Sequence, residues 1–133
     1  ANDSARVFKD IVITNSVALA SVTTAYNSNA KGIFVFTNSG FSVRALSRLR
    51  PEIPIIALTP HSKVYHQLAL EWGVTPTLSS AKKNIQEAFI QISNFALEQR
   101  IVQLGDLVVV VAGDPFGISR TTNTMIVETI GDS

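Results

Sequence analysis

The sequence contains no cysteine, and charged residues make up only 16% of its 133 positions. The lack of cysteine excludes a disulfide framework, a thiolate metal site and a thiol nucleophile, and it fits the reducing cytoplasm. The formal net charge is only +1, which argues against a general nucleic-acid partner. No apolar run approaches the roughly 20 residues that span a bilayer, so no membrane partner is expected.

What is present is sufficient for one folded domain. Hydrophobic residues make up 46% of the chain, which argues against disorder. A chain of this length buries roughly two-thirds of its unfolded surface. The N-terminus, ANDSARVFKD, has neither an initiator Met nor a signal-peptide pattern. We therefore expect a domain excised from a longer chain, with residues 1–13 as an N-terminal lead-in and residues 14–131 as a single α/β domain.

Apolar residues at helical spacing predict helices in four segments. Thr14 or Asn15 is the expected N-cap of the first helix, Gly73 is expected to end the third, and Val43, Leu46 and Leu49 of the second are expected in the core. The fourth helix shows one apolar stripe, formed by Ile85, Ala88, Phe89, Ile92, Phe95 and Ala96. The segments are 13–30, Ser42–Arg50, Ser62–Gly73 and Asn84–Arg100.

Short runs rich in Val, Ile and Phe predict buried strands at Gly32–Thr37, Pro54–Thr59 and Gly105–Ala112. A further segment, Thr124–Gly131, alternates and carries Glu128, which suits a strand nearer an edge. Strands that alternate with helices indicate parallel βαβ units in a three-layer α/β sandwich. The last two strands are joined by residues 113–123 without a helix, so we expect the last strand to be antiparallel.

Three loops follow the carboxyl ends of the predicted strands, where open α/β sheets bind their ligands. They are Thr37–Ser42, Thr59–Ser62 and Gly113–Thr124. The first loop, TNSGFS, combines hydroxyls and an amide with a flexible glycine, and the N-terminus of a helix follows it at once. This combination favours phosphate or another small anion. The same residues also suit an ordinary turn with Ser42 as N-cap, so a loop that merely turns the chain is the alternative.

Known catalytic motifs are missing from the sequence. No Gly-Lys-Ser/Thr follows Gly40, so the loop is not a P-loop, and no Gly-x-Gly-x-x-Gly occurs anywhere. Thr37 and Phe41 stand where a nucleophile elbow requires glycines, which argues against Ser39 as a hydrolase nucleophile. We therefore predict no catalytic residue in this chain.

Two pairs of charged or titratable residues can be interpreted either as ordinary surface residues or as parts of a binding site. His61 and His66 lie five apart, which misses the spacing of one helical face, so we expect surface histidines and no metal site. Arg44 and Arg48 share a helical face at i, i+4. They either steer an anion or form a solvated face.

Three longer segments resemble the C-terminal domain of pyruvate kinase, and their order and spacing also match that family. They are TNSGFSVRALSRLRPEIPIIALTP, QLALEWGVTP and GDLVVVVAGDPFGISRTTNT, and the resemblance extends from about Thr14 to Gly131. It implies an α/β domain with a central, mostly parallel five-stranded sheet. It also implies that the catalytic site lies on a separate (β/α)8 barrel, with its metal-binding and substrate-binding residues outside this chain.

In that family this domain carries the allosteric effector site and part of the tetramer interface. The resemblance implies a phosphorylated effector: a sugar bisphosphate, a sugar monophosphate or a nucleotide such as AMP. The residues matching the family's phosphate loop are Thr37, Asn38, Ser39, Gly40 and Ser42. Those matching the loop that closes over the effector are Gly113, Gly117, Ser119, Thr122 and Asn123. Phe41 replaces Arg or Thr, and Arg120 replaces a small residue in this second loop, where it either supplies a compensating charge or blocks the pocket.

The leading hypothesis is thus a regulatory domain of a cytoplasmic, glycolytic phosphotransferase. The parent enzyme would transfer a phosphoryl group from phosphoenolpyruvate to ADP with Mg²⁺ and K⁺, while this fragment alone would be inactive. One alternative is a free-standing α/β enzyme that acts on a small phosphate ester. Another is an oligomerisation domain whose phosphate pocket is vestigial.

Overall fold

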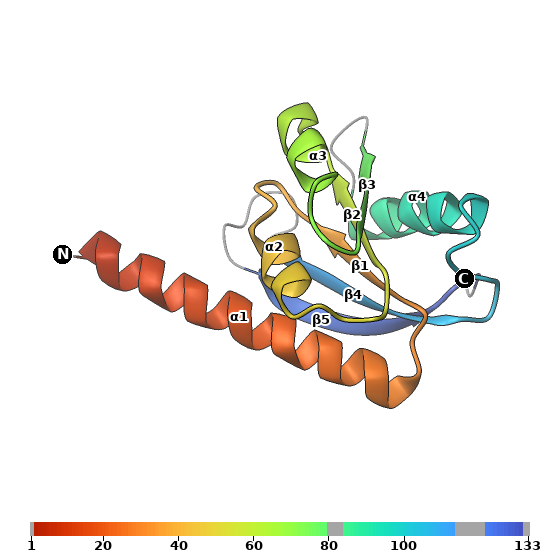
Figure 1. Cartoon of the computed structure of the whole chain (residues 1–133), viewed down its shortest axis with the longest axis horizontal. Helices are drawn as coiled ribbons and strands as arrows, with labels where there is room; N and C mark the ends of the chain where they lie inside the picture. Colours follow the sequence, from red (N-terminus) through yellow and green to blue (C-terminus); the bar gives the residue numbers. More distant parts are fainter. Residues whose placement is uncertain (1, 80–83, 114–121, 132–133) are drawn as a thin grey trace.

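The computed structural model describes residues 2–79, 84–113 and 122–131 of the chain. Helices and strands alternate along these residues until two strands follow one another at the end (Figure 1). The elements are α1 (Asn2–Ser28), β1 (Gly32–Phe36), α2 (Phe41–Arg48), β2 (Ile55–Thr59), α3 (Ser62–Leu68), β3 (Val74–Leu78), α4 (Ile85–Glu98), β4 (Leu107–Gly113) and β5 (Thr122–Thr129).

The strands form one five-stranded sheet with the order β3-β2-β1-β4-β5. The first four strands are parallel to one another, and β5 runs antiparallel to β4. The predicted fold class, a mostly parallel sheet with an antiparallel last strand, is therefore confirmed. Glu128 is exposed on β5, which is an edge strand as its alternating pattern indicated.

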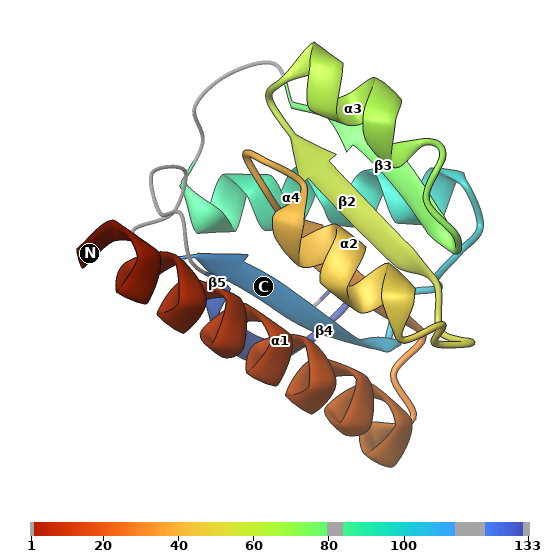
Figure 2. The same cartoon turned by 60° about the vertical axis from the view of Figure 1, so that its left-hand side comes forward.

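Helices cover the sheet on both faces, which makes three layers (Figure 2). Ile33 and Val35 of β1 face the layer formed by α1, α2 and α3, whereas Phe34 and Phe36 face α4. Because both faces of β1 are covered, all five of its residues are buried. This explains why the strand appears in the sequence as a continuous apolar run rather than an alternating one.

Helix α4 follows its predicted pattern closely. The Asn84 side chain caps the helix by accepting from the Glu87 amide at 2.8 Å, and it donates to the Glu87 carboxylate at 3.0 Å. Ala88, Ile92 and Ala96 are buried against the sheet, and the more open Ile85, Phe89 and Phe95 pack beside them. The predicted apolar stripe is confirmed.

The predicted N-cap of the first helix is wrong, because α1 begins at Asn2. Thr14 lies within the helix and is only 1% exposed, and Asn15 is also helical. Residues 1–31 contain no Gly or Pro that would end a helix, so a residue that favours an N-cap does not start one here. The division of the chain at residue 13 stays a prediction, although α1 crosses it without a break.

Two other helix ends differ from their predictions. Gly40, not Ser42, is the N-cap of α2, and Leu49 follows the helix with 44% of its surface exposed instead of entering the core. Helix α3 ends at Leu68, so Gly73 does not terminate it. Gly73 instead takes a φ of 72° directly before β3, where the backbone bends into the next strand.

Strand β3 was not predicted from the residue pattern. Its sequence, VTPTL, includes Pro76, and none of its residues is buried. Proline in a short run normally argues against a central strand. As the edge strand beside β2, however, β3 can carry proline where no further strand needs its amide.

Candidate functional site

The loop Thr37–Ser42 leaves the carboxyl end of β1 and leads directly into α2. Gly40 has a φ of 83°, so the loop turns through a left-handed residue that favours glycine. The Thr37 hydroxyl accepts from the Gly40 amide at 2.7 Å, and the Ser39 hydroxyl accepts from the Phe41 amide at 3.3 Å. Since a hydroxyl can accept and donate at once, both side chains can still donate to a ligand.

The start of α2 is electrostatically suited to an anion. Gly40 supplies no side-chain cap, and the first turn of α2 carries no acidic residue. The first amides of a helix lack intrahelical acceptors and carry the positive end of the macrodipole. Ser39 is exposed beside these amides, whereas Ser42 is 8% exposed and lies mostly under the surface.

The base of the second predicted loop lies on the strand next to this site. Val35 of β1 pairs with Val111 of β4; Thr37 follows the end of β1, and Gly113 is the last residue of β4. Gly113 pairs in turn with Thr122, and the register shifts between Ala112 and Gly113. The two loops therefore leave the sheet from the carboxyl ends of neighbouring parallel strands.

Not all residues of the second loop can be placed. Thr122 and Asn123 belong to β5, so they begin a strand instead of lying in the loop as expected. Gly117, Ser119 and Arg120 lie outside the described residues. The structure thus pairs Gly113 with Thr122, where β4 and β5 meet the loop. The roles of the remaining loop residues stay a prediction.

The histidine pair behaves as a surface feature. His61 and His66 are both exposed, and His66 Nδ1 lies 2.7 Å from the Ser62 carbonyl oxygen of its own helix. Within residues 2–79, 84–113 and 122–131, no group of three or more His, Asp or Glu side chains could hold a metal ion.

Arg44, one of the two arginines that the sequence placed on one helical face, contacts the Thr37–Ser42 loop. Its Nη2 donates to the Ser39 carbonyl oxygen at 3.0 Å, and the side chain is half-buried. Arg48, one turn later, is exposed. The contact of Arg44 with the loop could have been predicted from its place in the first turn of a helix, because helical side chains tilt toward the N-terminus.

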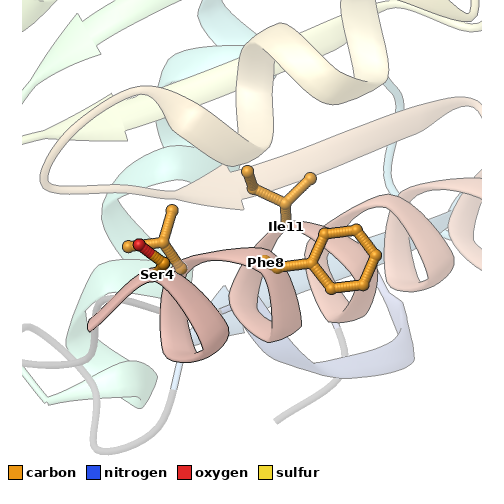
Figure 3. A pocket seen from close by; sticks show the side chains of 4 residues that line it. Ser4, Phe8 and Ile11 are labelled. Carbon is orange, nitrogen blue, oxygen red and sulfur yellow. The ribbon is translucent and has the colours of Figure 1, made fainter. Parts of the chain in front are cut away.

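A second surface feature lies on the first half of α1. A hollow of about 380 Å³ is lined by Ser4, Val7, Phe8 and Ile11 (Figure 3). Three of these four side chains are apolar, so the hollow lacks the donors that an anion requires. It was missed from the sequence because residues 1–13 were expected to form only a lead-in.

Fold and loop together define a class: an α/β domain with two helical layers and its polar loops beyond the carboxyl ends of a mostly parallel sheet. The family model for the pyruvate kinase alpha/beta domain matches residues 15–128. The chain therefore belongs to the family of pyruvate kinase α/β domains, as the resemblance of its motifs indicated. None of the described helices is both long enough and apolar enough to cross a bilayer.

Individual relatives support the same family. The chain is 39% identical over 125 residues to a pyruvate kinase of Lactobacillus delbrueckii subsp. bulgaricus, covering 94% of this chain and 21% of the relative. It is 40% identical over 114 residues to a pyruvate kinase of Clostridium acetobutylicum, covering 86% of this chain and 24% of the relative. The chain thus spans about a fifth of the length of the curated relatives it matches.

Proposed function

We propose that this chain is the regulatory C-terminal domain of a cytoplasmic pyruvate kinase. In this proposal the Thr37–Ser42 loop binds the phosphate of an allosteric effector, either a sugar phosphate or AMP, and the loop after Gly113 closes over it. The parent enzyme would transfer a phosphoryl group from phosphoenolpyruvate to ADP on a catalytic barrel outside this chain. Mg²⁺ and K⁺ would belong to that barrel.

The observation that carries the proposal is the start of α2 at a glycine, beside the hydroxyls of Thr37 and Ser39. Gly40 brings the backbone into α2 with a φ of 83°, and the first turn of α2 carries no acidic residue that would compete with an anion. Thr37 and Ser39 each use an acceptor lone pair within the loop, so their hydroxyl hydrogens are available to phosphate oxygens. Hydrogen bonds to a charged group contribute about 1.5–3 kcal/mol each, enough for several together to hold one phosphate.

A second part of the proposal is that the domain contributes to subunit contacts through α1. Phe8, Val12, Leu19 and Tyr26 are exposed by 70%, 46%, 58% and 48%. Their spacing of four, seven and seven residues places them on one side of the helix. Large exposed apolar side chains that gather on one surface are typical of protein contacts, and we name these four residues the α1 stripe.

The effector part is tested by calorimetric titration of the chain with fructose 1,6-bisphosphate, ribose 5-phosphate and AMP. At least one should bind the wild type. Ser39→Asp should abolish that binding, because it places a negative charge beside the phosphate. Ser39→Ala removes only one donor and should weaken binding by about ten-fold or somewhat more.

Thermal unfolding provides the control for this experiment. Asp at position 39 can accept from the Phe41 amide, as Ser39 does, and can pair with Arg44. We therefore expect Ser39→Asp to be at least as stable as the wild type, so that its loss of binding is not a loss of fold. Effector binding that survives Ser39→Asp unchanged would show that the phosphate binds elsewhere and that the loop is only a turn.

A further inference from the structure

The inference concerns Arg44, whose side chain folds back over the start of its own helix. Its Nη2 donates to the Ser39 carbonyl oxygen at 3.0 Å. A Cβ placed on Gly40 would lie only 2.5 Å from Nη1 and 3.3 Å from Cζ of Arg44. The guanidinium therefore rests directly against the glycine of the loop. A glycine at position 40 permits both the left-handed backbone and this close approach.

This position is unfavourable for a cation unless an anion joins it. The N-terminus of a helix already carries a partial positive charge, so a guanidinium there adds like charge to like. The first turn of α2 offers no acidic residue to offset it. Among the described residues, the Arg44 guanidinium bonds to a neutral carbonyl, that of Ser39, rather than to a carboxylate.

We propose that Arg44 is the specificity-determining residue that makes this site select a doubly charged phosphate ester over a singly charged anion of the same shape. The inference rests on the proposed function of the loop. A guanidinium has five N–H donors in a rigid plane, and only one of them is used for Ser39. The remaining donors can form a paired contact with phosphate oxygens, the geometry that favours arginine over lysine.

The helix amides and the loop hydroxyls supply less of this selectivity than a guanidinium does. They carry only partial charges, so their interaction energy changes less between a singly and a doubly charged anion than that of a full positive charge. A full positive charge gains more from the dianion, because the Coulomb energy scales with the product of the charges. Arg44 is thus the group whose removal should change the preference between the two anions, and not only the strength of binding.

The test compares ribose 5-phosphate with ribose 5-sulfate by calorimetry at pH 8. The phosphate ester is close to doubly charged at this pH, since its second pKa is about 6, whereas the sulfate ester carries one charge. The wild type should prefer the phosphate ester. Arg44→Gln should weaken phosphate-ester binding by about ten-fold or more and sulfate-ester binding much less, so that the preference falls toward one.

Arg48→Gln is the matched control, because Arg48 lies on the same helix and is exposed one turn further from the loop. It should leave both affinities and their ratio unchanged. If Arg44→Gln weakened both esters by the same factor, Arg44 would only hold the loop in shape, and the inference would be wrong. An unchanged ratio in Arg44→Gln with full binding of both esters would also overturn it.

Two further outcomes separate this inference from the proposed function. If the wild type binds no phosphorylated ligand at all, the proposed function fails, and this inference fails with it. If the wild type binds phosphate and sulfate esters equally well, the site stands but Arg44 is not its charge selector. Should Arg44→Gln fail to fold, Arg44→Lys takes its place. It should still prefer the phosphate ester to the sulfate ester, although it binds the phosphate ester more weakly. Loss of this preference in Arg44→Lys would contradict a charge-based role.

Discussion

Gly40 shows how much a single residue can decide in this domain. It takes a φ of 83°, it is the N-cap of α2, and it lies against Arg44 and the buried Leu68. A side chain there would be strained by the backbone and crowded by its neighbours. The expected phosphate loop therefore depends on glycine for its shape and for its contact with the guanidinium.

Replacing this glycine should cost more stability than replacing a glycine of the same conformation elsewhere. Gly73 has a φ of 72°, and a Cβ there would meet no atom within 4 Å. Gly73→Ala should thus lower the free energy of unfolding by only the left-handed penalty, about 1–2 kcal/mol. Gly40→Ala adds a contact of 3.2 Å with Leu68 Cδ2 and should cost about 1 kcal/mol more.

Urea unfolding of both variants measures this difference directly. If Gly40→Ala and Gly73→Ala lose equal stability, the neighbours of Gly40 give way without cost. In that case the close approach of Leu68 does not restrict position 40, and only the positive φ requires glycine there.

At the scale of the element, α1 differs most from its expected form. Its second half supplies Ala18, Ser21 and Ala25 to the interface with the sheet, and all three are buried. Its first half extends beyond the rest of the fold toward the N-terminus (Figure 1), where Val7 and Phe8 are more than half exposed. One helix thus combines a core-forming segment with an apolar surface.

The α1 stripe should mediate self-association of the chain. Leu19 is 58% exposed at its centre, so Leu19→Glu should weaken association by placing a charge in an apolar contact. Ala20 is also exposed but lies about 100° around the helix. Ala20→Glu adds the same charge outside the α1 stripe and should leave association unchanged.

Sedimentation equilibrium over a range of concentrations distinguishes these variants. The wild type and Ala20→Glu should associate with similar constants, while Leu19→Glu should remain closer to the monomer. A wild type that stays strictly monomeric at high concentration would remove the support for subunit contacts through α1.

At the scale of the whole molecule, the sheet keeps its polar loops apart from its packed faces. Its four parallel strands direct their carboxyl ends toward one edge, where the polar loops follow β1 and β4. Its two faces are filled by two apolar clusters, one against α1, α2 and α3 and the other against α4. The effector proposed for the loop edge would therefore lie outside both clusters.

The chain alone should form no pyruvate from phosphoenolpyruvate and ADP. It spans about a fifth of its curated relatives, and we propose that the catalytic barrel lies in the remainder of the parent. A coupled assay with Mg²⁺ and K⁺ should give the rate of the buffer alone, and a longer polypeptide that includes the barrel is the positive control. Turnover by the purified chain would contradict this division of labour.

Local pattern was sufficient for most of the fold. Strands β1, β2 and β4 are apolar runs because helices cover both faces of the sheet, and α4 carries a stripe of period 3.6 with Asn84 as its cap. These signals are local consequences of burial, so they can be read without coordinates. The motif around Thr37–Ser42 and Gly113–Asn123 identified the family, although the phosphate-binding roles of these residues stay a prediction.

Tertiary structure decided what depends on contacts between distant segments. Thr14 is a helix-interior residue because α1 packs on the sheet, and local cap propensity is too weak to override that packing. VTPTL is a strand because β2 offers it a pairing edge that tolerates Pro76. The place of Arg44 against Gly40 follows from a left-handed turn and a side-chain rotamer. Sequence spacing puts Arg44 and Arg48 on one face, but only the folded loop distinguishes the one that reaches Ser39 from the one that is left in solvent.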